Sequence, residues 1–140
     1  MTKPVAVIDT NVVVSGLISQ QTDSPPCYIL DEMLAGNISF LLSLDLLTEY
    51  RQVLLRPKMK KLHQLTEDEV DNILTAISVN GQVRDPPLSP NPGPDPGDQH
   101  IWDLMDAYPD AVLVTGDVAL QEFRNTKSIV LSPKVFVSNL

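Results

Sequence analysis

The segment PVAVIDTNVVVSGLI, residues 4–18, decides the fold that we expect for this chain. Its first five residues are apolar and mostly β-branched, which is typical of a short strand buried on both faces of a sheet. The strand ends at Asp9. Two good helix N-caps, Thr10 and Asn11, then precede a helical stretch over residues 12–18. The segment therefore predicts a strand, a turn and a helix, with Asp9 at the carboxyl end of the strand.

Strands and helices continue to alternate along the rest of the chain. Further short apolar strands are expected at residues 38–42, 111–115 and 129–131. Helices are expected from Pro25 to Gly36, from Ser43 to near Pro57, from Thr66 to near Gly81, from Asp98 to Tyr108, over residues 118–123, and from Pro133 onward. Such alternation implies a mainly parallel sheet with helices on both faces. We expect the α/β class and one domain over residues 1–140.

Residues 85–97 hold six of the twelve prolines of the chain. This composition predicts a surface loop of polyproline character. A linker between domains is the alternative, but too little chain follows the loop to form a second domain.

Composition favours a cytoplasmic protein. The chain has 140 residues and 43% apolar content, which is enough for an ordinary core. No apolar stretch approaches the roughly 18 residues that a membrane span needs, and no secretory leader is recognisable. The lone Cys27 cannot form an internal disulfide, which fits a reducing compartment, and it is expected to be a small buried residue of a helix.

The charge distribution is uneven. A net charge of −8 argues against a dedicated nucleic-acid binder, because affinity for phosphate backbones comes mainly from Lys and Arg. Half of the ten basic residues nevertheless fall in one window without acids: Arg51, Arg56, Lys58, Lys60 and Lys61. This window is a candidate phosphate contact. The alternative is a solvated helix end whose dipole favours cations.

Several acids occupy positions that suit chemistry. Asp9 and Asp117 directly follow expected parallel strands, and sites in such sheets form beyond the carboxyl ends of the strands. Asp98 lies three residues before Ile101, so it continues the apolar stripe of its helix toward the sheet. Glu49 lies on the helix that Ser43 begins.

Each acid also has a purely structural interpretation. Asp98 and Asp117 could cap helices, Asp9 could accept backbone N–H bonds, and Glu49 could pair with Arg51 or Arg56. Carboxylates that converge in one cleft, however, raise one another's pKa values unless a cation compensates their charge. Hard oxygen ligands of this kind select Mg²⁺ or Mn²⁺.

Other common sites are not indicated. The chain has no thiolate spacing for zinc, no Walker-type phosphate loop and no G-x-S-x-G nucleophile elbow. Of the two histidines, His63 is expected to be exposed, whereas His100 is close enough to Asp98 to touch the site.

Four ordered motifs resemble the PIN-domain family, in particular its VapC-like branch of toxins from toxin–antitoxin pairs. Residues 7–17 resemble the family's opening, and residues 46–54 the helix that bears its second acid. Residues 95–98 and 114–117 resemble its third and fourth acidic motifs, and the Leu-Ser-Pro at residues 131–133 its usual ending. The resemblance covers nearly the whole chain and implies a three-layer α/β/α nuclease fold.

The resemblance also implies residue roles. Asp9, Glu49, Asp98 and Asp117 match the metal-binding catalytic acids. Asn11, Ser15 and Thr115 match the polar positions that orient these acids, and Asp95 matches an outer acid. Gly97 departs from the pattern, because related proteins often have another Asp there.

The implied activity is Mg²⁺- or Mn²⁺-dependent hydrolysis of RNA, single-stranded or structured, by a metal-activated water. An antitoxin protein and a second copy of the chain are the implied partners. Because Trp102 lies off the main stripe of its helix, it could supply a homodimer surface or be buried within the monomer.

Two other functions remain as alternatives. One is a catalytically inactive PIN-like scaffold that binds RNA or a protein. The other is a haloacid-dehalogenase-like phosphatase, which also begins with an Asp after the first strand. That chemistry needs a second Asp two residues later, and the chain has Asn11 at this position.

Overall fold

The sheet that the opening segment predicts is present, and all of its strand pairs are parallel. The structure is a computed structural model that describes residues 4–90, 93–123 and 127–140. Within these residues the strands follow the order β3-β2-β1-β4-β5. They are β1 (Ala6–Ile8), β2 (Phe40–Leu42), β3 (Gln82–Val83), β4 (Val112–Val114) and β5 (Ile129–Leu131). The expected mainly parallel sheet is confirmed.

Strand β1 lies at the centre of this sheet. Its Ala6 pairs with Phe40 of β2 on one side and with Val112 of β4 on the other. Every residue of β1, β2 and β4 is buried, which explains why these strands are continuously apolar. The central position of β1 places Asp9 at the middle of the carboxyl edge.

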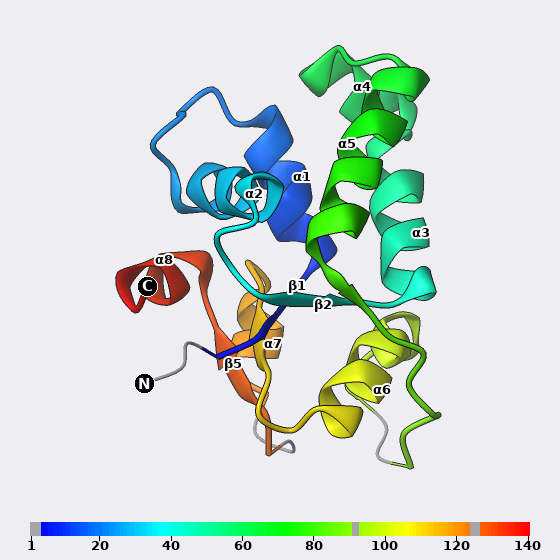
Figure 1. The fold of residues 1–140 in the computed structure, drawn as a ribbon, viewed down its shortest axis with the longest axis vertical. Helices are drawn as coiled ribbons and strands as arrows, with labels where there is room; N and C mark the ends of the chain where they lie inside the picture. The colour runs from blue at the N-terminus through cyan, green and yellow to red at the C-terminus, as the bar shows by residue number, and fades with distance from the viewer. Residues whose placement is uncertain (1–3, 91–92, 124–126) are drawn as a thin grey trace.

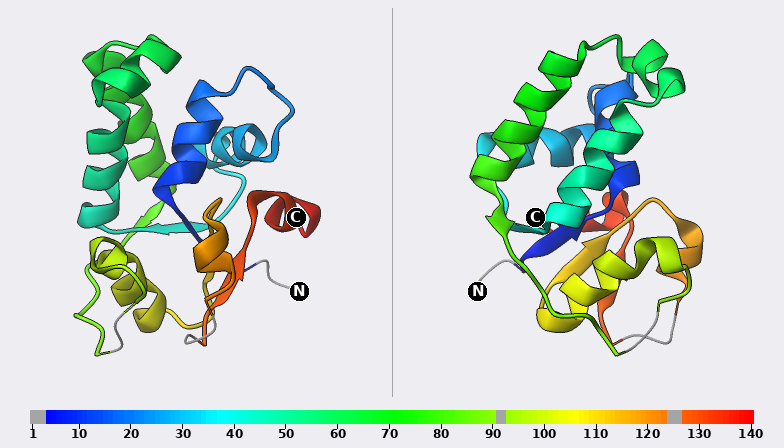
Figure 2. Two further views of the ribbon diagram at one scale, coloured as in Figure 1. Left: turned by 180° about the vertical axis from the view of Figure 1, so that it is seen from behind. Right: turned by 90° about the vertical axis from the view of Figure 1, so that its right-hand side faces the viewer.

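Helices cover both faces of the sheet. The helices of the described chain are α1 (Thr10–Ile18), α2 (Pro25–Ala35), α3 (Leu44–Leu54), α4 (Pro57–His63), α5 (Glu67–Asn80), α6 (Gln99–Ala107), α7 (Val118–Gln121) and α8 (Pro133–Ser138). Helices α1 to α5 lie on one side of the sheet, and α6 and α7 lie on the other (Figures 1 and 2). The three-layer α/β/α architecture is therefore confirmed. None of the described helices has the length and apolar content to cross a membrane.

The capping residues that the sequence predicts are found at most of the helix ends. Ser24 caps α2 ahead of Pro25, and Gly36 ends that helix in the left-handed conformation (φ 74°). Thr66 and Glu69 form the expected capping box of α5. Cys27 is buried in α2, as expected.

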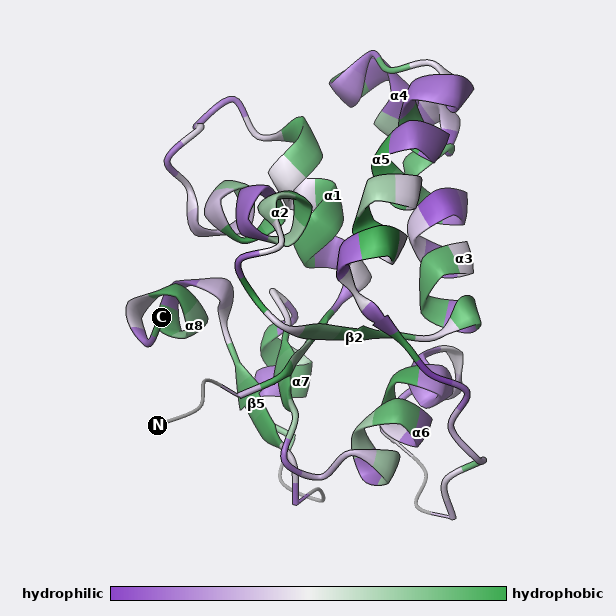
Figure 3. Cartoon of the chain, viewed as in Figure 1, coloured by the Kyte–Doolittle hydropathy of each residue, from purple (hydrophilic) through white to green (hydrophobic). Residues whose placement is uncertain are grey.

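Two features differ from expectation. Asp9 itself caps α1, in place of Thr10 or Asn11. The helix that Ser43 begins ends at Leu54, near Pro57 as expected, but a further helix that was not expected, α4, begins with Pro57 at its first position. Proline cannot donate the hydrogen bond that would continue α3, but it suits the first turn of a new helix. Helix α4 has no buried residue and is mostly hydrophilic (Figure 3).

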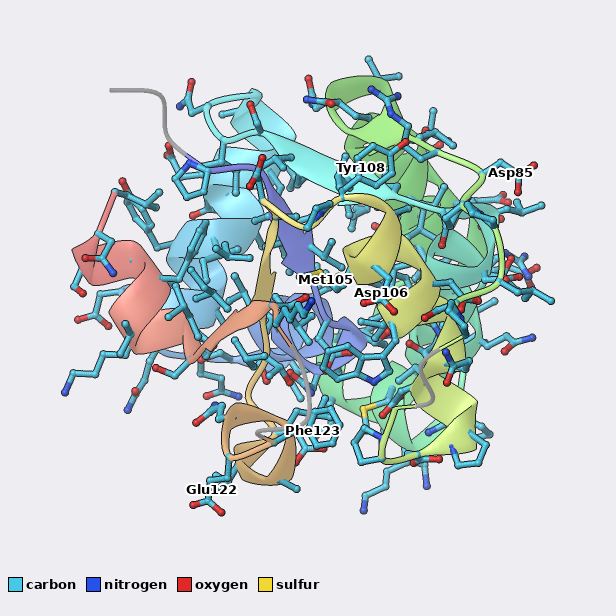
Figure 4. The ribbon with its side chains drawn as sticks, turned by 90° about the horizontal axis from the view of Figure 1, so that it is seen from below. Asp85, Met105, Asp106, Tyr108, Glu122 and Phe123 are labelled. Atoms are coloured by element: carbon cyan, nitrogen blue, oxygen red, sulfur yellow. The ribbon has the colours of Figure 1, made fainter. Side chains whose placement is uncertain are left out.

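Trp102 belongs to the core of the monomer. Residues 101–105 of α6 are all buried, and Trp102 is only 2% exposed. Its ring lies 5.3 Å from the ring of Phe123, which follows α7 (Figure 4). The suggestion that Trp102 supplies a dimer surface is therefore wrong, because this side chain is already buried within the monomer.

The described part of the proline-rich loop is irregular, as expected, and is held against α6. The amide of Ser89 donates to Oδ1 of Asp103 (2.8 Å), and the amide of Gly93 donates to Oε1 of Gln99 (3.0 Å). Residues 91 and 92 lie outside the described residues.

Candidate active site

Two of the acids lie side by side at the carboxyl edge of the sheet. Asp9 follows β1 and Asp117 follows β4, and these strands are neighbours. Both carboxylates cap helices: Asp9 accepts from the amide of Thr10 (2.8 Å), and Asp117 accepts from the amide of Ala119 (2.9 Å). Both acids therefore cap helices, as the structural interpretation predicted, and both also lie at the sheet edge where a site can form.

All four acids line one pocket of about 480 Å³. Helix α1 contributes residues with helical spacing along one face, and α3 contributes Glu49 and Val53. The remaining wall comes from Arg56 and Met59 at the start of α4, from Asp98 at the end of the turn before α6, and from Asp117 after β4. The lining residues are Asp9, Thr10, Asn11, Val14, Ser15, Ile18, Glu49, Val53, Arg56, Met59, Asp98 and Asp117.

Asp9 is held in a polar network. Its Oδ2 accepts from the buried hydroxyl of Thr115 (2.7 Å) and from the side-chain amide of Asn11 (3.1 Å). The oxygen of the Asn11 amide accepts from the amide of Gly116 (2.8 Å). Asn11 thus joins β1 to the end of β4 and orients the Asp9 carboxylate. Ser15 lines the pocket one turn further along α1.

Glu49 has partners other than the arginines. The hydroxyl of Thr10 donates to its Oε2, and Nε2 of His100 lies 3.5 Å from its Oε1. His100 therefore does touch the site. Its Nδ1 is buried and has no hydrogen-bond partner among the described residues.

The five basic residues of the window separate into three groups. Arg51 is held in ion pairs with Glu67 (2.6 Å) and Asp71 (2.8 Å), so its charge is already compensated. Arg56 lines the pocket. The other three, Lys58, Lys60 and Lys61, are exposed on α4.

The electrostatics of the pocket disfavour ionised carboxylates. Burial, with a smaller contribution from Glu49 and Asp117, raises the pKa of Asp9, although hydrogen bonds from Thr115 and Thr10 oppose this shift. Burial and the charges of Asp9, Asp95 and Glu49 raise the pKa of Asp98 to about 6, although His100 opposes the shift. A bound cation would relieve both penalties.

The donor set fits a hard divalent cation in chemistry and charge. It consists of carboxylate oxygens, which Mg²⁺ and Mn²⁺ prefer. Within residues 4–90, 93–123 and 127–140, no three Asp, Glu, His or Cys side chains are gathered tightly enough to hold an ion between them. The suitability of the pocket for a divalent cation therefore rests on its oxygen donors and on their uncompensated negative charge.

Asp95 has a different position from the four acids. Its Oδ1 accepts from the amide of Gly97 (2.9 Å), so it caps the 3-10 turn η1 (Pro96–Asp98), and it does not line the pocket. It acts on the site through its charge, which contributes to the raised pKa of Asp98.

The contact of Thr10 with Glu49 was not predicted from the sequence, and neither was the apolar part of the pocket lining. A signal for the apolar residues was present. Asn11, Val14, Ser15 and Ile18 have the spacing i, i+3, i+4, i+7 of one helix face, and Glu49, Val53 and Arg56 have the spacing i, i+4, i+7.

Asp98→Asn should stabilise the metal-free protein at pH 7 and reduce the pH dependence of its stability. A carboxyl group whose pKa is higher in the folded state binds protons more tightly there, so its contribution to stability falls as the pH rises from 3.8 to about 6. Thermal unfolding in EDTA across this range measures the effect. Asp31→Asn, an exposed acid on α2, is the control. Identical pH profiles for Asp98→Asn and the parent would contradict the prediction.

A family model described as PIN domain matches residues 5–119, a range that includes all four acids of the pocket. None of the curated proteins matches the chain.

Proposed function

Because this match covers most of the chain, the protein belongs to the PIN-domain family, and we propose that it is a Mg²⁺- or Mn²⁺-dependent endoribonuclease. The family has a nuclease-type fold and generally uses divalent metals. RNA as the substrate and hydrolysis of its phosphodiester bonds are our proposal for this chain.

One observation carries the proposal: four carboxylates from four separate segments line the same pocket. Two of them, Asp9 and Asp98, have pKa values that their surroundings raise. Helix capping explains one contact of Asp9 and one of Asp117, but it does not explain why Glu49 and Asp98 join them. A site for cations explains the whole set, because a bound cation allows converging carboxylates to stay ionised at neutral pH.

We assign the metal to Asp9, Glu49, Asp98 and Asp117. A cation bound there would activate the attacking water and stabilise charge on the phosphate. Asn11 and Thr115 hold the Asp9 carboxylate, and Thr10 and His100 hold that of Glu49. These neighbours would fix the donors before substrate binds, which limits the reorganisation needed in the reaction.

The basic residues near the pocket are proposed as phosphate contacts. Lys58, Lys60 and Lys61 are exposed on α4, and Arg56 joins them at the pocket wall. This local positive charge would offset the net charge of −8 where the RNA backbone approaches. Arg51 contributes least, because Glu67 and Asp71 already neutralise it.

The finer role as a toxin, with an antitoxin partner and a homodimeric state, rests on the resemblance of the motifs alone, and the proposed cytoplasmic location rests on composition. The phosphatase alternative loses support, because the amide of Asn11 is bound to Asp9 and Gly116 and cannot act as an acid or base. The inactive scaffold remains the competing function, and the experiment below distinguishes it.

The purified protein should cleave RNA only when Mg²⁺ or Mn²⁺ is present. EDTA should reduce cleavage to background, and excess Mn²⁺ should restore it, because the carboxylates supply no nucleophile of their own. Gel analysis of a labelled RNA measures this. Undiminished cleavage in EDTA would contradict metal dependence, and intact RNA under every metal condition would favour the scaffold.

A further inference from the structure

The pocket has an apolar half that the proposed metal chemistry does not use. Further along α1 and α3 than the carboxylates, its wall is formed by Val14 and Ile18 of α1, Val53 of α3 and Met59 of α4. Val14 is buried, and the other three are half-buried. This part of the wall suits a ligand group that has an apolar face.

Arg56 lines the same part of the pocket as Met59. Among the described residues it is the one basic residue of the pocket lining, and it forms no ion pair with any of them. Its neighbour Lys58 has the same charge and is also exposed, but it does not line the pocket. The guanidinium is therefore available for an anionic group in the pocket, and its planar donor arrangement suits a phosphate.

We propose that the apolar half is a subsite for one unpaired nucleobase of the substrate, with Met59 against the face of the base and Arg56 on the adjoining phosphate. The inference rests on the proposed ribonuclease function and deepens it by naming the residues that would hold one nucleotide of the substrate. A methionine thioether makes favourable contacts with aromatic rings, and branched aliphatic side chains complete the apolar wall.

The size of the pocket restricts the substrate further. At about 480 Å³ it falls in the range of roughly 300–1,000 Å³ that holds one drug-sized molecule, so a single nucleotide fits. Because every base has an aromatic face, such a subsite tolerates many sequences.

The test uses the methionine methyl signals of the full chain, labelled with ¹³C and measured in EDTA. Adenosine 5′-monophosphate should shift the Met59 methyl signal upfield in a saturable manner, because an aromatic base above a methyl group shields it. Ribose 5-phosphate, which lacks the base, should leave that signal in place. Met33 and Met105 are fully buried and serve as internal controls. Met59→Leu assigns the signal.

Two variants test the phosphate contact. Arg56→Ala should raise the Kd for adenosine 5′-monophosphate several-fold, whereas Lys134→Ala, which removes the same charge from the exposed surface of α8 outside the pocket lining, should change it by less than about twofold. A single-stranded hexaribonucleotide should shift the Met59 signal, and the same strand in a duplex should not.

The subsite is excluded if saturating nucleotide leaves the Met59 signal unmoved, or if ribose 5-phosphate moves it equally. It is also excluded if Lys134→Ala weakens binding as much as Arg56→Ala. These readouts need neither metal nor cleavage. A protein that binds the nucleotide but cleaves no RNA would thus refute the proposed function and retain the base subsite.

Discussion

Asp9→Asn should lower the rate of RNA cleavage at saturating Mg²⁺ by at least about a hundredfold. Asp9 is the most central of the four acids, because it follows the middle strand of the sheet and has both oxygens oriented. Oδ1 accepts from the amide of Thr10, and Oδ2 accepts from Thr115 and Asn11. The substitution preserves the shape of the side chain but removes the charge that a cation requires.

The fold should survive this change. Relief of burial and repulsion at Asp9 offsets the loss of its charge-assisted hydrogen bonds, so the Tm in EDTA should be unchanged or higher. Asp31→Asn removes one charge from the exposed face of α2 and should cleave RNA as the parent does. If Asp9→Asn retains parental activity, the nuclease is a contaminant or uses another site. Loss of activity in both variants would point to a general effect of charge.

Gly16→Val should destabilise the protein by about 3 kcal/mol and abolish cleavage where the protein is unfolded. Gly16 lies where α1 packs on α2. A Cβ atom there would lie 2.8 Å from the carbonyl oxygen of Pro26 and 2.9 Å from Cβ of Leu30. Neither atom can move without shifting α2, so the two helices must separate. Urea denaturation measures the change in the free energy of unfolding.

Two further substitutions make this prediction specific. Gly16→Ala should cost less, because alanine gains about 1 kcal/mol of helix propensity over glycine. At Gly97, a Cβ atom would meet only Oδ1 of Asp95 at an ordinary 3.4 Å, so Gly97→Ala should leave stability nearly unchanged. Equal stability of Gly16→Val and the parent would show that α1 and α2 are not packed as closely as described.

The sequence allowed prediction of the elements that a local physical rule determines. The strands β1, β2 and β4 are buried on both faces, so their residues had to be continuously apolar, and all three were expected. The helix ends at Gly36 and Thr66 follow from capping chemistry. The position of Asp9 and Asp117 at one edge followed from the parallel topology.

Features that depend on long-range contacts could not be predicted. Strand β3 has two exposed residues, so it has no apolar pattern, and it exists only because Gln82 and Val83 pair with β2. The burial of Trp102 depends on Phe123, which is distant in sequence. The contact of Glu49 with Thr10 likewise joins helices whose packing no local pattern reveals.

The central position of β1 also bears on biosynthesis. The hydrogen bond from Thr115 to Asp9 joins residues 106 positions apart, and β1 pairs with β4 over a similar separation. Contacts between residues so far apart in sequence form slowly, because closing the long loop costs conformational entropy before the strands gain their hydrogen bonds. A nascent chain that has Asp9 and Glu49 outside the ribosome still lacks Asp98 and Asp117. Nuclease activity should therefore begin only when translation has passed β4, so that a stalled or truncated chain is harmless to the RNA around it.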